Sequence, residues 1–133
     1  MAARKRSAPL AREPVPVEDY DRLSPLFSFE YLDHEFCLEQ CDKDQKSDLA
    51  EAIVKRANIM WRDLQIAGRH KLGTERIDVE QTAISERIPP RFTDGRLIVF
   101  RYSGNLPMVG FRHQRIFYVL AIEAHFGDLY VHG

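Results

Sequence analysis

Apolar residues are concentrated in the last third of the chain, where they form consecutive short runs. Residues 96–133 read RLIVFRYSGNLPMVGFRHQRIFYVLAIEAHFGDLYVHG. Three or four apolar runs follow one another here, and only short polar turns separate them. Such an arrangement is typical of an antiparallel β-meander, which needs apolar residues on at least one face to pack against a core. The sequence therefore predicts a meander at this end of the chain.

A second pattern, over residues 45–67, has the period of a helix. Apolar residues recur there three and four positions apart, at Leu49, Ile53, Ala57, Met60 and Leu64. This spacing predicts one amphipathic helix with a single apolar stripe, and we expect Trp61 at the edge of the stripe to be a core residue. Asp42 or Asp44 is a suitable N-cap, and Gly68 is a suitable C-cap.

The remaining patterns are shorter. LFSFEYL, over residues 26–32, predicts a strand, residues 68–76 form a loop framed by glycines, and residues 77–88 predict a short helix. Residues 1–25 contain four prolines and no periodicity, which predicts a disordered tail. Helices followed by antiparallel strands predict one α+β domain over residues 26–133, a small meander sheet with helices on one face.

Overall composition and charge point to no particular partner. The chain is 44% hydrophobic and 29% charged, as ordinary globular proteins are, and its net charge is −1. Charge is unevenly distributed, however, because residues 95–133 carry four arginines against two acids, which is compatible with a basic binding face. No apolar run approaches the roughly 18 residues of a membrane span, and no secretory signal is evident, so the cytoplasm is the expected compartment.

The two cysteines, Cys37 and Cys41, are one helical turn apart. We interpret them as small apolar residues on one face. A zinc site formed with His34 is the alternative, but no fourth ligand lies nearby in the sequence. A disulfide between them is disfavoured in a reducing compartment. The sequence thus predicts neither a metal nor a cofactor.

The arginines within the predicted meander are the candidates for chemistry. Burying an unpaired guanidinium is costly. Arg101 and Arg112 therefore either pair with acids such as Glu75 or Glu123, or line a surface that binds an anion. Arginine forks onto phosphate and stabilises the charge that develops when a phosphodiester is cleaved.

Tyr130 and His132 lie two residues apart in the last predicted run, so they share one face. They are either a base-stacking and acid–base pair or ordinary surface residues. In phosphodiester chemistry, His132 or Glu75 would take the proton of a ribose 2′-hydroxyl, and a second histidine or a tyrosine would protonate the leaving 5′-oxygen. No metal is required when the 2′-hydroxyl is the nucleophile.

The order of these segments resembles the RelE/ParE superfamily of small bacterial toxins. The resemblance is carried by LFSFEYL, by the helical stretch to Ala67, by the basic triplet at 69–71, and by IVFRYSG, MVGFRH, RIFYVLAIE and DLYVHG. It implies a RelE-like α+β fold and metal-free cleavage of mRNA on the ribosome. It also implies an antitoxin protein as partner. ParE-type members act instead on DNA gyrase, so a non-catalytic protein-binding module is the alternative function.

The resemblance also implies roles for individual residues. The implied catalytic residues are Arg101, Arg112, Tyr130, His132 and Glu75. The implied RNA-binding residues are Arg69, His70 and Lys71. In these roles the two strand arginines contact the scissile phosphate, the C-terminal pair stacks on a base and transfers a proton, and the glutamate is a possible base. No oligomeric state and no membrane partner are predicted.

Overall fold

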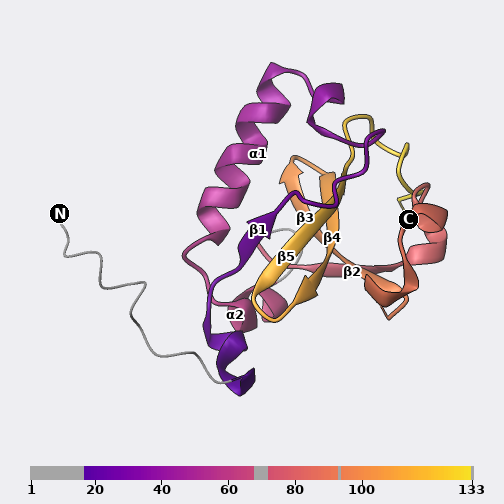
Figure 1. The fold of residues 1–133 in the computed structure, drawn as a ribbon. Coiled ribbons are helices and arrows are strands. Elements are labelled where there is room, and N and C mark those ends of the chain that lie inside the picture. The colour runs from indigo at the N-terminus through magenta and orange to yellow at the C-terminus, as the bar shows by residue number, and fades with distance from the viewer. Residues whose placement is uncertain (1–16, 68–71, 93, 133) are drawn as a thin grey trace.

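The computed structural model describes residues 17–67, 72–92 and 94–132 (Figure 1). The described chain forms a five-stranded sheet with two α-helices, so the α+β class is confirmed. The elements are β1 (Leu26–Ser28), α1 (Lys43–Arg56), α2 (Trp61–Ile66), β2 (Glu75–Asp78), β3 (Arg96–Ser103), β4 (Leu106–His113) and β5 (Ile116–Ile122). The strand order is β1-β5-β4-β3-β2, and β1 runs parallel to β5 while the other pairs are antiparallel.

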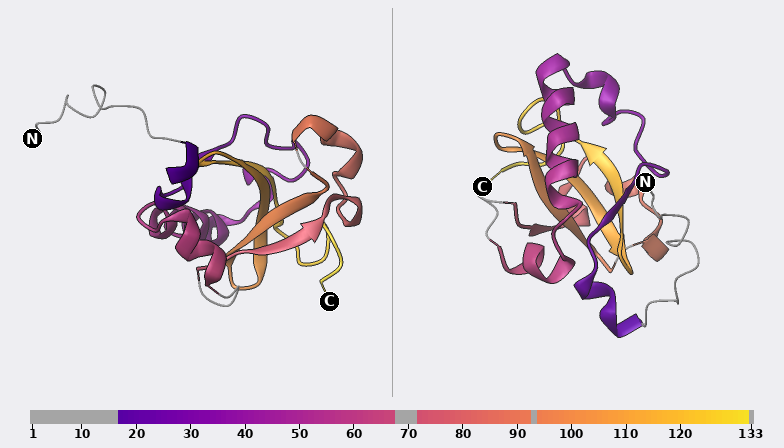
Figure 2. Two further views of the ribbon diagram at one scale, coloured as in Figure 1. Left: turned by 90° about the horizontal axis from the view of Figure 1, so that it is seen from below. Right: turned by 90° about the vertical axis from the view of Figure 1, so that its left-hand side faces the viewer.

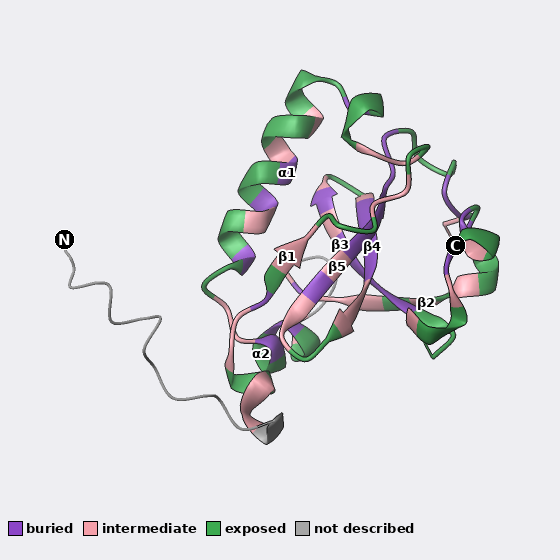
Figure 3. Ribbon diagram, viewed as in Figure 1, coloured by how far each residue is buried: buried purple, intermediate pink, exposed green. Residues whose placement is uncertain are grey.

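The predicted meander is present as β3, β4 and β5. Its two hairpin turns each contain a residue with positive φ, Gly104 at 57° and Gln114 at 58°. Gly110 lies where β4 and β5 approach most closely, because a Cβ there would come within 1.9 Å of the Tyr118 carbonyl oxygen. The apolar runs fill the centre of the sheet, which is buried on both faces (Figure 3).

The two faces of the sheet have separate cores. Both helices cover one face, where Trp61, Phe100 and Phe117 are fully buried. The other face is covered by the 3-10 turns of residues 79–92 and by the C-terminal segment, which enclose Leu97 and Val109. Figure 2 shows the helices and these turns on opposite sides of the sheet. The helices thus lie on one face, as predicted, but the second face is covered as well.

The predicted single helix over residues 45–67 is two helices. Its start is as expected, since Asp42 caps α1 by accepting a 2.8 Å hydrogen bond from the backbone of Gln45. The chain then turns before Trp61, whose backbone N–H and indole N–H both donate to carbonyls of other segments. These bonds fix the indole in the core at a position that a continuous helix would not reach. Neither helix of the described chain has the length and apolarity needed to cross a membrane.

Three local predictions were wrong. β1 stops at Ser28, whereas a strand to residue 32 was expected. Glu75 lies on β2 and not in a loop. Residues 77–88 were expected to be helical, yet they finish β2 and then form two 3-10 turns. The reason is that Ile77 and Val79 alternate with charged neighbours, which suits a strand that pairs with β3.

The folded region begins before the expected boundary at residue 26. Val17–Arg22 form a 3-10 helix, and Asp21 forms a 2.6 Å ion pair with Arg112. Arg115 donates to the carbonyl of Ser24 at 3.0 Å. Residues 17–25, which were predicted to belong to a disordered tail, therefore contact the β4–β5 end of the sheet. Residues 1–16 of the predicted tail lie outside the described chain.

A bidentate ion pair ties the turns of residues 79–92 to the segment after β1. Arg87 donates to both carboxylate oxygens of Asp33, at 2.6 and 3.1 Å. Burial alone would raise the pKa of Asp33, but the hydrogen bonds from Arg87 and from the Glu35 backbone outweigh it and lower that pKa below its ordinary value of 3.8. A lowered carboxylate pKa contributes stability above the unfolded pKa, and this contribution is lost as the pH falls through the folded pKa.

Replacing Arg87 by alanine is therefore expected to lower the melting temperature by about 2–4 °C at pH 7. The difference from the native protein should vanish near pH 2, where Asp33 is protonated in both folded and unfolded chains. Thermal unfolding at the two pH values measures this. Arg62→Ala is the matched control, because Arg62 pairs only loosely with its exposed neighbour Asp63 at 3.9 Å. An equal loss at both pH values would contradict the assignment.

Candidate functional site

A cleft of about 820 Å³ opens at the end of β3 that lies beyond its pairing with β2. The register of β2 with β3 reaches only from Asp78–Arg96 to Glu75–Val99, so the following residues of β3 border the cleft. Its walls come from α1, the β3–β4 turn and the C-terminal segment. Four of the five predicted catalytic residues line it: Glu75, Arg101, Tyr130 and His132.

Arg101 is the centre of a set of polar contacts in this cleft. Its Nε and Nη2 each lie 2.8 Å from Oε2 of Glu75, and its Nη1 donates to the Asn105 carbonyl. Nη1 also lies 3.1 Å from Nδ1 of His132. Arginine has donors only, so Nδ1 must accept this bond and the ring proton must be on Nε2. The His132 imidazole is therefore neutral in this arrangement.

Glu123 holds the other side of the same imidazole. Oε1 of Glu123 accepts from Nε2 of His132 at 2.8 Å, and Oε2 accepts from the backbone N–H of Leu129 at 2.8 Å. The Glu123 side chain is 0% exposed. A continuous series of contacts thus runs from Glu75 through Arg101 and His132 to a fully buried carboxylate. We call these four residues the acid–arginine–histidine network.

Two aromatic rings sandwich His132. Tyr130 stacks on it with centroids 4.1 Å apart, and Phe126 stacks at 3.9 Å. Tyr130 and His132 are thus side by side, as predicted, although the segment that carries them is not a strand. Val131, between them, is 89% exposed, so the expected apolar opposite face does not exist. Phe126 is 58% exposed, which leaves an aromatic surface at the mouth of the cleft.

Arg112 is not part of this cleft. Ile98 is opposite Gly110 in the register of β3 and β4, which puts Arg112 and Arg101 on different faces of the sheet. The Arg112 guanidinium lies 4.6 Å over the Trp61 ring and forms an ion pair with Asp21. The structure therefore does not bring the two predicted strand arginines together. The predicted RNA-binding residues Arg69, His70 and Lys71 lie outside the described chain.

Arg56 borders the cleft from below, and the sequence did not predict its position. We expected it on the solvated face of the helix, but it is 1% exposed. Its guanidinium donates to the carbonyls of Ala52, Leu72 and Arg101 at 3.0–3.2 Å and lies 4.9 Å over the Phe100 ring. Burial lowers the pKa of Arg56 to about 10, which still leaves it charged at neutral pH. The cleft thus has a buried cation beside the backbone of Arg101.

The cysteines lie apart from the network. Cys37 and Cys41 are both free thiols, and Cys41 is buried with its Sγ 3.6 Å from the Tyr102 hydroxyl. Within residues 17–67, 72–92 and 94–132, no group of three histidine, cysteine or acidic side chains is placed to hold a metal ion. The interpretation of Cys41 as a small core residue agrees with its position.

Sequence reasoning missed two members of the site. It considered Glu123 only as an ion-pair partner of the arginines, and it gave Phe126 no role. The signal for Glu123 was its place directly after the apolar run of β5, where a lone acid entering the core needs a partner. Phe126 carried no such signal, because its contact with His132 depends on the path of the C-terminal segment.

Comparison of the chain with models of known protein families, with curated proteins and with solved structures found no match. The resemblance to the RelE/ParE superfamily therefore stays a prediction from the sequence.

Proposed function

We propose that this protein is a RelE-like, metal-independent endoribonuclease that cleaves mRNA. The observation that carries the proposal is the direct contact of Glu75, Arg101 and His132 within one cleft. A carboxylate, an arginine and a histidine are the three groups needed to activate a 2′-hydroxyl, bind a phosphate and protonate a leaving oxygen. The element order, with β1 leading through two helices to a meander, agrees with the fold that the resemblance implies.

The proposed reaction is a transesterification. Glu75 takes the proton of the ribose 2′-hydroxyl, and the freed oxygen attacks the adjacent phosphorus. Arg101 stabilises the additional negative charge on the phosphate oxygens. The bond from phosphorus to the 5′-oxygen breaks, and His132 gives that oxygen its proton. The products are a 2′,3′-cyclic phosphate and a free 5′-hydroxyl, and solvent restores the protons on Glu75 and His132.

Substrate binding would prepare His132 for this role. The neutral imidazole has both nitrogens engaged, and adding a proton to Nδ1 would bring it against a guanidinium donor. A phosphodiester placed between Arg101 and His132 would replace that contact with two charge-assisted hydrogen bonds. The imidazole could then hold a second proton between the phosphate and the Glu123 carboxylate. Phe126 is suitably exposed to stack on a neighbouring base.

The proposed biological setting is a toxin–antitoxin pair, with mRNA on the ribosome as substrate and a small antitoxin protein as partner. Expression in bacteria is then expected to arrest growth. Arg101→Ala should relieve the arrest, because the scissile phosphate loses its cation. Growth and translation that continue unchanged while the native protein accumulates would contradict this setting.

Purified protein should cleave RNA in the presence of EDTA, alone or with translating ribosomes. Arg101→Ala and Glu75→Gln should each lower the rate at least about a hundredfold. Arg62→Ala, an exposed arginine outside the cleft, is the control and should cleave at the native rate. RNA with a 2′-O-methyl group at the cleaved position should resist. Loss of activity in EDTA, or equal cleavage of the methylated RNA, would refute the mechanism.

One observation favours the second candidate, a non-catalytic protein-binding module. The guanidinium of Arg101 is already bonded to a carboxylate, a carbonyl and an imidazole. In such a module these contacts would hold the C-terminal segment in place, and exposed Phe126 and Val131 would contact a partner protein. Phe126→Ala should then weaken capture of a ribosome, gyrase or antitoxin partner, and RNA should remain intact with every variant.

A further inference from the structure

A second concave surface lies at the opposite end of β3 from the cleft. The register of β3 and β4 begins at Ile98–Gly110, and before this pair the two strands leave a cavity of about 470 Å³. Four arginines line it, Arg76, Arg91, Arg96 and Arg112, against the single acid Asp94. By contrast, the acids and bases that line the cleft are equal in number. The strongest concentration of positive charge on a concave surface is therefore here.

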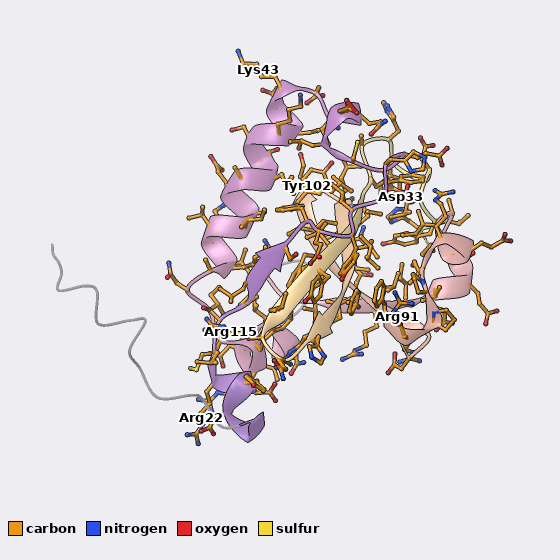
Figure 4. All side chains as sticks on the ribbon, viewed as in Figure 1. Arg22, Asp33, Lys43, Arg91, Tyr102 and Arg115 are labelled. Carbon is orange, nitrogen blue, oxygen red and sulfur yellow. The ribbon has the colours of Figure 1, made fainter. Side chains whose placement is uncertain are left out.

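Two of these arginines are available to an external anion. Within the described chain, no carboxylate forms an ion pair with Arg76 or Arg91, and both residues are exposed. The Arg91 guanidinium lies 4.5 Å over the ring of Phe92, which holds it beside the cavity (Figure 4). Arg96 and Arg112 face Asp78 and Asp21, at 3.6 and 2.6 Å. The charge of the surface thus rests chiefly on Arg76 and Arg91.

The same surface carries a cluster of aromatic rings. Phe92 and Phe111 are stacked at 5.4 Å with only 8° between their planes, and Phe111 stacks on Tyr118 at 4.9 Å. Tyr31 closes the cluster at 4.7 Å from Phe92 and is 42% exposed. A neighbouring cavity of about 350 Å³ is lined by Tyr31 and shares Arg91 and Phe92 with the first. The two cavities therefore form one basic, aromatic groove.

We propose that this groove binds a single strand of nucleic acid. Arginines that follow a groove attract the phosphate backbone, and half-exposed rings beside them offer faces on which unpaired bases stack. A duplex keeps its bases stacked inside, and an acidic peptide would use the arginines but not the rings. The proposal does not rest on RNA cleavage. β2 would link the two surfaces if both operate, because Glu75 lines the cleft and its neighbour Arg76 lines the groove.

The test measures the fluorescence anisotropy of two labelled oligouridines of about 12 nucleotides, one with 2′-O-methyl ribose and one with deoxyribose. Neither probe offers a 2′-hydroxyl, so binding is measured without cleavage. The full chain should bind, and its affinity should fall with salt by a slope of about −0.7 per phosphate contact. Arg76→Ala with Arg91→Ala should weaken binding at least about tenfold and reduce the slope by about 1.

A third variant tests the stacking part of the proposal. Tyr31→Leu keeps the apolar bulk of this exposed residue but removes its ring, and should weaken binding at least about fivefold without changing the salt slope. Lys43→Ala is the control, because Lys43 starts α1 at the far end of the molecule from Arg91 (Figure 4). Melting curves confirm that each variant is folded.

Several outcomes would overturn the proposal. These are no binding of either probe, equal binding by the double arginine variant and by Lys43→Ala, and competition by polyglutamate as effective as by the unlabelled oligonucleotide. A stronger affinity for one probe would identify the sugar that the groove accepts. If Arg101→Ala abolishes RNA cleavage but binds both probes normally, the groove and the cleft are separate sites. Binding that persists when no cleavage is found would leave the groove assignment intact and refute the nuclease.

Discussion

Replacing Glu123 by alanine is expected to lower the free energy of unfolding by about 3–5 kcal/mol. Glu123 is fully buried and accepts hydrogen bonds from the His132 ring and from the Leu129 backbone. Alanine would leave both donors unpaired inside the protein and would open a cavity beneath the stacked rings. The C-terminal segment would lose its main attachment. Urea titration at pH 7 measures the loss.

Two further variants separate the causes of this loss. Glu123→Gln keeps the volume and can still accept from Leu129, so it should cost less than alanine. It should nevertheless displace His132, because an amide donor facing Nε2 would force the ring proton to Nδ1, towards Arg101. Glu80→Ala removes an exposed acid of the same charge and should change stability by less than about 0.5 kcal/mol. A loss below about 1 kcal/mol for Glu123→Ala would contradict the assigned role.

A double-mutant cycle tests whether Glu123 acts through His132. If the two side chains are coupled, the losses in Glu123→Gln and His132→Ala should not add in the double variant. The coupling should also reach Arg101, since His132 lies between them. Additive losses would mean that Glu123 stabilises the protein through Leu129 alone.

The meander could be predicted because its signal is local. Each apolar run is bounded by turn residues, and strand pairing across a short turn needs no other part of the chain. The strand β2 was missed for the opposite reason. It has four residues, and its pairing with β3 is made across a segment of 3-10 turns that no periodicity reveals. Likewise, an even helical stripe does not show that Trp61 must turn into the core.

The candidate site was predicted in part for a similar reason. Tyr130 and His132 are close in sequence, and Arg101 lies on a strand whose end they reach, so a short-range argument sufficed. The face on which Arg112 lies depends on the register of β3 and β4, which the turn alone did not fix. The basic groove was out of reach, because it draws its arginines from β2, β3, β4 and the turn after residue 89.

Arg56 is the residue for which sequence and structure differ most. Its neighbours on α1 are charged, and its spacing put it with them on the outer face. In the structure it is buried and bonded to the carbonyls of Leu72 and Arg101, which belong to segments that come together only in the folded chain. Helix periodicity describes one element alone, so it could not reveal that the border of the sheet needs a donor here.

Arg56→Ala is expected to lower the free energy of unfolding by about 3–5 kcal/mol. The carbonyls of Leu72 and Arg101 would lose their donor, and the contact with the Phe100 ring would be replaced by a cavity. Arg56→Met fills most of the volume and removes a buried charge, so it should cost about 1–3 kcal/mol, the penalty for the unpaired carbonyls. Chemical denaturation at pH 7 distinguishes the two.

Arg56→Lys completes the argument, because it keeps the charge but not the planar fork. One ammonium cannot reach three carbonyls in the directions that the guanidinium serves, so lysine should be less stable than arginine. If charge alone mattered, lysine would equal the native protein and methionine would be the worst of the three. We expect instead that methionine and lysine fall together between arginine and alanine, because the hydrogen bonds to Leu72 and Arg101, more than the charge, join α1 to the border of β3.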